Sequence, residues 1–128
     1  MILDTVVLID LEREITRGKA GPAMAALKRF GKQELFLTPT IAGELAAGQS
    51  MQSHDVWSRF IEPFTLLMIN PQVCWKYGEL FRGLRSKGTM IGANDLWIAA
   101  TALAYNEGLL SRNRSDFRKI SQLRLETY

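Results

Sequence analysis

Four acidic residues have apolar neighbours in the sequence, where a carboxylate is costly unless it has a task. They are Asp4, Glu44, Asp95 and Asp116. Like charges that are held close together repel and raise one another's pKa, so a cluster of four needs a cation to offset it. Carboxylate oxygens suit a hard divalent cation. If the fold gathers these side chains, they predict an all-oxygen site for Mg²⁺ or Mn²⁺.

Each of the four also has an ordinary interpretation. Asp4, Asp95 and Asp116 can be N-caps or first-turn acids, which the helix dipole favours, and Glu44 can be an exposed helical residue. Taken one at a time, these interpretations are the better ones, because acids are common at helix starts. Only their convergence on one edge of the fold indicates a site.

Other site chemistries have little support in the sequence. His54 is the only histidine, and its neighbours Ser53 and Asp55 indicate a solvated helix start. Cys74 is the only cysteine, lies among core-type residues, and is interpreted as a packing residue. A single cysteine forms no internal disulfide, which suits a reducing compartment. No glycine-rich phosphate-binding loop is present.

Short apolar runs alternate with helical patterns along the chain, and this predicts an α/β fold. Strands are expected at 2–3, 35–38, 66–69, 109–111 and 123–127. Helices are expected at 5–14, 22–30, from Pro39 past Glu44, 56–64, 73–84 and 94–105. Continuous apolar strands between helices are typical of a short parallel sheet covered by helices on both faces.

This arrangement places the four acids at a common edge. Asp4 ends the first strand, Glu44 lies early in the helix after the second, Asp95 opens a buried helix, and Asp116 follows the fourth strand. The carboxyl ends of parallel strands share one edge, where ligands usually bind. We therefore expect the four carboxylates to approach one another there.

Size and charge narrow the class of protein. The 128 residues, 47% hydrophobic and 23% charged, predict a single domain over 1–128 that needs no metal or disulfide for stability. A start without basic residues and the lack of a long apolar run predict a cytoplasmic protein with no membrane span. Residues 76–128 hold nine basic and five acidic groups, against seven and eight in 1–75. A basic second half favours a polyanionic partner, although solvated surface charge explains it equally well.

Four segments together resemble a known family. In chain order they are 3–10 (LDTVVLID), 38–45 (TPTIAGEL), 91–100 (IGANDLWIAA) and 111–117 (SRNRSDF). The set resembles a PIN-domain ribonuclease and, more narrowly, the VapC-type toxins of bacterial toxin–antitoxin pairs. The resemblance covers the whole chain, and the last two segments are the more specific. Ser111 stands where the family often has Thr, and both residues carry a hydroxyl.

The resemblance implies a PIN-like three-layer fold of strand order 3-2-1-4-5 and a Mg²⁺- or Mn²⁺-dependent endoribonuclease. It implies that Asp4, Glu44, Asp95 and Asp116 are the catalytic and metal-binding acids, with Thr5, Ser111 and Asn113 as auxiliary residues. It also implies an RNA substrate such as tRNA, a homodimer, and inhibition by a small antitoxin protein.

The physical interpretation agrees with that implication. In metal-assisted phosphodiester hydrolysis the metal makes a bound water more acidic and stabilises charge on the attacked phosphate. We assign Asp4 and Asp95 to a central metal, Glu44 to a ligand or water-orienting role, and Asp116 to the weaker or second-metal side.

Basic residues near the proposed edge are candidates for RNA backbone contacts. Arg112 and Arg114 flank the edge in sequence, and Arg82, Arg85 and Lys87 precede Asp95 by fewer than about fifteen positions. Their alternative interpretation is ordinary solvated surface charge.

Two rivals come from other classes of protein. A non-catalytic interaction module could retain the fold, with apolar residues forming either a partner surface or core: Met24, Phe30, Met51, Trp57 and Phe60. A phosphoacceptor receiver domain also places acids on a parallel sheet edge. It lacks support, because there is no adjacent acid pair at the first strand and no lysine near the last strand end.

Overall fold

The computed structural model describes residues 1–128. Five two-residue strands alternate with seven helices. The strands are β1 (Ile2–Leu3), β2 (Phe36–Leu37), β3 (Thr65–Leu66), β4 (Leu109–Leu110) and β5 (Leu125–Glu126). The helices are α1 (Thr5–Thr16), α2 (Pro22–Arg29), α3 (Pro39–Ala46), α4 (His54–Ile61), α5 (Pro71–Ser86), α6 (Ala93–Ala104) and α7 (Arg114–Phe117).

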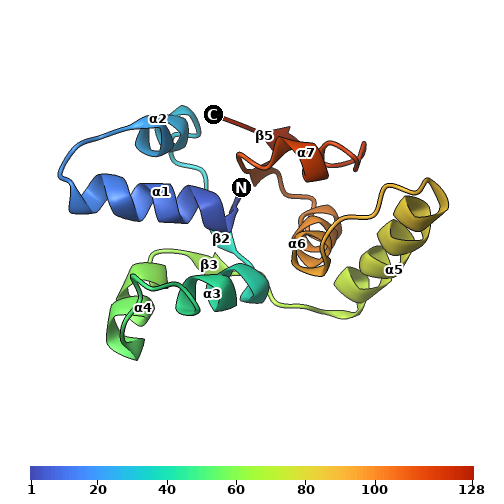
Figure 1. Cartoon of the computed structure of the whole chain (residues 1–128), viewed down its shortest axis with the longest axis horizontal. Helices are drawn as coiled ribbons and strands as arrows, with labels where there is room; N and C mark the ends of the chain where they lie inside the picture. Colours follow the sequence, from blue (N-terminus) through green and yellow to red (C-terminus); the bar gives the residue numbers. More distant parts are fainter.

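The strands form one parallel sheet of order β3-β2-β1-β4-β5. Figure 1 shows the sheet between two helical layers, with α1 to α4 on one side and α5 to α7 on the other. The α/β class, the covered parallel sheet and the strand order expected from the sequence are confirmed. The chain adds β2 and β3 on one side of β1 and then β4 and β5 on its other side, so the strand order reverses between β1 and β4 while all strands stay parallel. Such a switch point leaves a crevice at the carboxyl ends of the two strands.

Helix starts follow from local hydrogen bonding. The Thr38 hydroxyl accepts a bond from the backbone N–H of Ile41 at 3.2 Å and caps α3, while Pro39 occupies the first helical position. Asn70 caps α5 in the same way through the N–H of Val73 at 2.9 Å, followed by Pro71. An Asn or Thr before Pro therefore starts a helix at a fixed residue.

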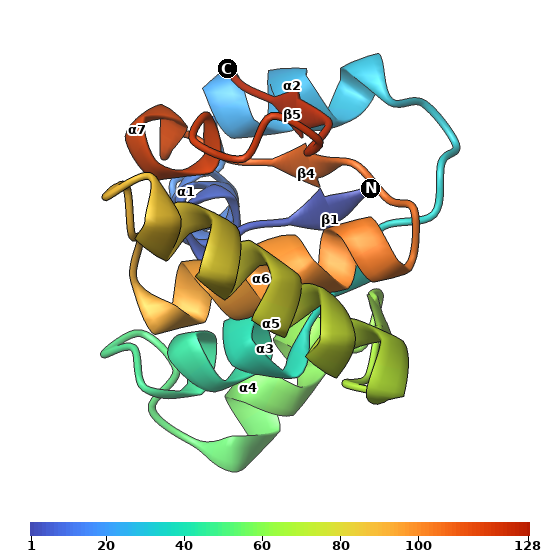
Figure 2. The same ribbon diagram turned by 90° about the vertical axis from the view of Figure 1, so that its right-hand side faces the viewer.

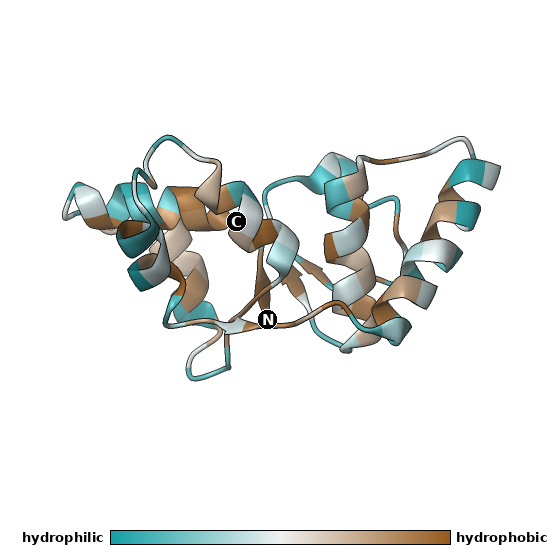
Figure 3. Ribbon diagram, turned by 90° about the horizontal axis from the view of Figure 1, so that it is seen from below, coloured by the Kyte–Doolittle hydropathy of each residue, from teal (hydrophilic) through white to brown (hydrophobic).

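The core lies between the sheet and both helical layers. Helix α6 is buried through most of its length and packs between the sheet and α5, which crosses over it in Figure 2. Trp97 of α6 stacks on Tyr77 of α5, with ring centroids 4.0 Å apart. Figure 3 shows apolar strands at the centre and hydrophilic residues along the outer helix surfaces. Buried apolar area of this kind is the main term that stabilises the fold.

Some expectations need correction. Helix α4 begins at His54 instead of residue 56 and ends at Ile61 instead of residue 64, because the Ser53 hydroxyl caps it by accepting from the N–H of Val56 at 3.2 Å. Strand β3 is Thr65–Leu66 instead of 66–69. Helix α7, over Arg114–Phe117, was not expected.

Cys74 is exposed on α5, so its interpretation as a packing residue is wrong. The helix turns Val73 inward and leaves the next side chain facing water. The solvated position of His54 is confirmed, since 81% of its side chain is exposed.

The apolar residues with two possible roles belong mainly to the core. Met51 is buried, and Phe30, Trp57 and Phe60 pack against the core cluster. The indole N–H of Trp57 donates to the carbonyl of Ala42 at 2.9 Å. None of the seven helices is both long enough and apolar enough to span a membrane.

Candidate active site

Asp4 and Ser111 meet at the switch point of the sheet. Asp4 follows β1, is only 5% exposed, and caps α1 by accepting from the N–H of Thr5 at 2.8 Å. Ser111 follows β4, is fully buried, and donates its hydroxyl to the other carboxylate oxygen of Asp4. The capping role considered for Asp4 is therefore present, and the same side chain also faces the crevice.

Glu44 is brought to this place by α3. The Thr5 hydroxyl donates to one of its carboxylate oxygens, and the Asn94 amide donates to the other at 2.9 Å. These donors come from the starts of α1 and α6, on opposite sides of the sheet. Glu44 thus links the two helical layers across the edge that carries Asp4.

Asp95 is the third residue of α6 and is half-buried. Its carboxylate accepts from the side-chain amide of Asn113 at 3.0 Å. The backbone N–H of Asn113 in turn donates to the Ser111 hydroxyl at 2.9 Å. A chain of hydrogen bonds therefore runs from Asp95 through Asn113 and Ser111 to Asp4.

The acids influence one another's ionisation. Burial and, after it, the negative charges of Asp4, Asp116 and Glu44 together raise the pKa of Asp95 to about 6. Burial also raises the pKa of Asp4, with a smaller upward effect from Glu44, although hydrogen bonds from Ser111 and Thr5 act in the opposite direction. Charged groups held against one another in this way favour a cationic ligand.

Three of the four acids line one open cavity. Asp4, Glu44 and Asp95 share its wall with Thr5, Arg112 and Asn113. Asp116, on α7, is outside that lining and forms an ion pair with Lys119 at 3.3 Å, but its charge still reaches Asp95. No three acidic, histidine or cysteine side chains lie close enough together to hold a metal ion in this arrangement.

Of the basic candidates, only Arg112 reaches the cavity. Arg82 and Arg85 lie over the rings of Trp75 and Phe81 on α5, at 5.3 and 5.4 Å from the ring centroids. Lys87, at the end of α5, borders a separate hollow with Lys119. Arg114 is exposed at the start of α7 and forms no ion pair. Of the five basic candidates, Arg112 is therefore the one that the structure places beside the carboxylates.

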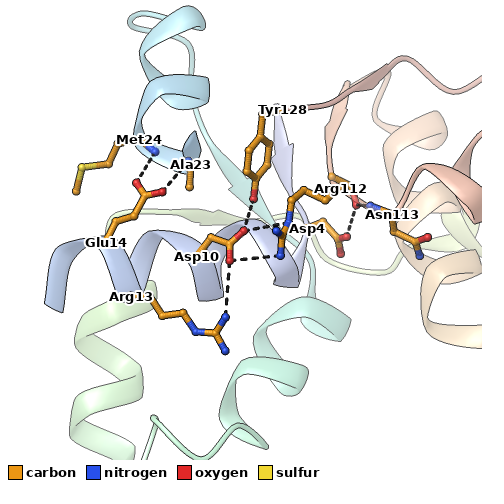
Figure 4. A network of polar contacts seen from close by, with 10 residues as sticks. Asp4, Asp10, Arg13, Glu14, Ala23, Met24, Arg112, Asn113 and Tyr128 are labelled. Atoms are coloured by element: carbon orange, nitrogen blue, oxygen red, sulfur yellow. Dashed lines mark hydrogen bonds and ion pairs between the residues drawn. The ribbon is translucent and has the colours of Figure 1, made fainter. Parts of the chain in front are cut away.

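Sequence reasoning missed three residues in and beside the cavity. Asn94 precedes Asp95 and holds Glu44, and its place next to an acid in the same motif was the available signal. Asp10 and Tyr128 form a network with Arg112 (Figure 4). No local pattern could have indicated contacts between residues 102 and 118 positions apart.

The PIN domain family model matches residues 1–123. The chain belongs to the PIN-domain family. Ribonuclease VapC1 of Haemophilus influenzae strain R2866 is 33% identical over 99% of this chain and 96% of that protein. Ribonuclease VapC of Rickettsia bellii is 30% identical over 99% of this chain and 95% of its own length. The chain therefore groups with the VapC ribonucleases of this family.

Solved PIN-domain structures have the same fold. VapBC-1 from nontypeable Haemophilus influenzae matches with a TM-score of 0.82 and 28% identity, covering 98% of this chain and 96% of that one. VapBC2 from Rickettsia felis, bound to a DNA fragment from the promoter, matches with a TM-score of 0.81 and 25% identity, covering 99% and 97%.

The site of this PIN-domain chain fits a divalent cation by its donor chemistry. Apart from the Arg112 guanidinium, the polar side chains of the cavity are carboxylates, a hydroxyl and an amide, and neither histidine nor cysteine is among them. After burial, the charges of Asp4, Asp116 and Glu44 contribute to the raised pKa of Asp95, so a cation at this place would be favoured. PIN-domain ribonucleases are generally dependent on divalent metals, in agreement with this donor set.

Proposed function

We propose that this chain is a divalent-metal-dependent endoribonuclease of the VapC type and the toxin of a toxin–antitoxin pair. The observation that carries the proposal is the cavity at the switch point, where Asp4, Glu44 and Asp95 converge from three different elements. Burial, and after it the negative charges of the neighbouring acids, raises the pKa of Asp95 to about 6, and carboxylates gathered in this way favour a cation.

The residues of the cavity would have two kinds of role: some would bind the metal, and others would orient the metal-binding carboxylates by hydrogen bonds. Asp4 and Asp95 would hold Mg²⁺ or Mn²⁺, Glu44 would be a further ligand or orient a water, and Asp116 would act from the outer side. The bound metal would supply a more acidic water and offset charge on the attacked phosphate. Support comes from auxiliary neighbours, which hold the carboxylate oxygens by hydrogen bonds: Ser111 on Asp4, Thr5 on Glu44 and Asn113 on Asp95.

The substrate would be RNA such as tRNA, and its backbone would meet Arg112 at the cavity. Arg114, Arg82, Arg85 and Lys87 remain candidates for more distant phosphates, where contacts would make binding sensitive to salt. We further propose a single-domain cytoplasmic protein over 1–128 that forms a homodimer and is inhibited by a small antitoxin. The relatives solved as VapBC toxin–antitoxin assemblies support the antitoxin.

The decisive experiment measures cleavage of total RNA by the purified chain. We expect cleavage with Mg²⁺ or Mn²⁺, none with a chelator, and a loss of about 100-fold or more in Asp4→Asn and Asp95→Asn. Asp55→Asn is the matched control, because Asp55 is 85% exposed on α4 and away from the cavity. Absence of cleavage by the wild-type chain would favour the non-catalytic interaction module instead.

A further inference from the structure

Asp10 is a polar hub on α1, two turns after Asp4. One of its carboxylate oxygens forms an ion pair with Arg112 Nε at 3.0 Å and accepts a hydrogen bond from the phenol of Tyr128 at 2.9 Å. The other oxygen accepts from a terminal nitrogen of Arg112 at 3.4 Å, and Arg13 approaches it at 3.9 Å (Figure 4). With only 17% of its side chain exposed, Asp10 is occupied from several sides.

Arg112 is held along one edge of its guanidinium. The contacts to Asp10 use Nε and one terminal nitrogen, and the N–H groups of the opposite edge have no protein partner. About half of the side chain is exposed, and it lines the same cavity as Asp4, Glu44 and Asp95. A planar fork with a free edge is suited to binding a phosphate with two hydrogen bonds.

Tyr128, which follows β5, contacts both Asp10 and Arg112. The Arg112 guanidinium lies 6.0 Å from the centroid of its ring, which restricts the arginine from above. Burial and the hydrogen bond to Asp10 raise the pKa of Tyr128, so its phenol stays a proton donor. The backbone beside it is fixed as well, because Arg29 donates to the carbonyl of Thr127 at 2.9 Å.

We propose that Asp10 and Tyr128 are positioning residues that hold Arg112 at the mouth of the carboxylate cavity, where its free edge binds a phosphate of the RNA substrate next to the bond that is cut. This inference rests on the proposed ribonuclease function. A half-exposed ion pair adds little to folding stability. Its geometry explains instead why an arginine, which keeps two donor edges, occupies position 112.

The test is a double-mutant cycle on RNA cleavage with Asp10→Ala, Arg112→Ala and the double variant. Each single change should lower kcat/KM about 10-fold, mainly through KM, because a phosphate contact is lost or misdirected. The double variant should be within about 2-fold of Arg112→Ala, since Asp10 acts only through Arg112. Tyr128→Phe keeps the ring, removes the donor, and should have a smaller effect of about 3-fold. Arg112→Ala should also reduce the salt slope of RNA binding by about one.

Arg13→Ala is the matched control, because it removes the other arginine of Asp10 but does not line the carboxylate cavity. It should leave kcat/KM unchanged. If Asp10→Ala misfolds, Asp10→Asn keeps the shape and removes the charge. The positioning role would be overturned if the losses in kcat/KM of the two single variants multiplied in the double variant, or if Asp10→Ala and Asp10→Asn kept full activity. Neither result would contradict the ribonuclease proposal itself. No cleavage by the wild-type chain would overturn the ribonuclease proposal as well.

Discussion

Each carboxylate of the cavity is held by a neutral hydroxyl or amide. These neighbours stabilise the acids without neutralising them, so the negative charge remains available to a cation. A hydrogen bond to a charged group contributes more than one between neutral groups. The donors come from three different elements: Thr5 from α1, Asn94 from α6, and Ser111 and Asn113 from the segment after β4.

Asp95 should make the metal-free protein pH-dependent. Its pKa of about 6 in the fold is above the 3.8 of an ordinary aspartate, so ionisation opposes folding. The penalty is complete above about pH 6, shrinks as the pH falls, and vanishes below about pH 4. In chelator, Asp95→Asn should therefore be more stable than the wild type by about 1 kcal/mol at pH 7.5, a value reduced for the half-exposed position. Urea unfolding across this pH range measures the difference.

Asp55→Asn serves as the reference for that measurement, since its exposed carboxylate lies outside the cavity. Its stability relative to wild type should vary much less between pH 4 and pH 7.5, because its ion pair with His54 at 3.8 Å is exposed. A constant difference between Asp95→Asn and wild type over the same range would contradict the electrostatic account.

Ser111→Ala should damage both stability and activity. The change leaves a buried oxygen of Asp4 without its hydroxyl donor and leaves the Asn113 N–H without its acceptor. We expect a loss of about 2 kcal/mol in the free energy of unfolding and a clear fall in kcat. Thermal unfolding and RNA cleavage measure the two effects. Ser121→Ala, at an exposed serine, should change neither, and an unaltered Ser111→Ala would show that the bond is dispensable.

At the scale of elements, the start of α3 determines where Glu44 lies. Thr38 is almost fully buried, and its hydroxyl supplies the N-cap. Thr38→Val should cost about 1–2 kcal/mol and reduce cleavage by loosening the helix that carries Glu44. Chemical unfolding and cleavage rates check this expectation. Ser53→Ala removes the exposed cap of α4 instead, and should cost less and leave cleavage intact. If the two variants changed cleavage equally, the N-cap of α3 would not act through the position of Glu44.

Sequence patterns predicted the elements well where a local signal exists. Pro39 marked the start of α3, and the apolar run after Asn94 marked buried α6, because capping and burial leave a trace in neighbouring residues. Helix α5 begins at Pro71, two residues before the expected start at residue 73, because Asn70 and Pro71 cap it as Thr38 and Pro39 cap α3. Strand β3 was misplaced because an apolar run does not show which two residues pair with β2.

The part of the site that depends only on the sheet topology was predictable from the sequence. Knowing that strand ends share an edge was enough to gather Asp4, Glu44 and Asp95. The departure of Asp116 toward Lys119 depends on the unexpected helix α7, and no strand rule describes it. Long-range partners such as Asp10 for Arg112 require the folded structure.

At the scale of the whole molecule, the cavity that holds Asp4, Glu44 and Asp95 is open to solvent. The solved relatives are VapBC assemblies, which supports control of the proposed nuclease by a partner protein. We expect expression of the wild-type chain alone to stop growth, and co-expression of a small antitoxin encoded beside it to restore growth. An arginine inserted by that partner could pair with the carboxylates and compete with a metal.

Growth curves after induction give the measurement. Asp4→Asn should grow normally with or without the neighbouring gene, whereas the wild type should grow only with it. Equal growth of all four cultures would contradict the toxin assignment, and the cleavage assay would then report whether a harmless RNA is the substrate.

The bond between Asp4 and Ser111 also has a consequence for synthesis of the protein. The two residues are 107 positions apart, and β1 has β4 as its neighbour in the sheet. Chains emerge from the ribosome at about 5–20 residues per second, starting with the N-terminus. Ser111 is therefore synthesised several seconds after Asp4. A nascent chain that is released before residue 111 cannot form the hydrogen bond between them or complete the switch point. Premature termination of translation would thus yield fragments that lack the assembled cavity, and only almost fully synthesised chains could be harmful to the cell that makes them.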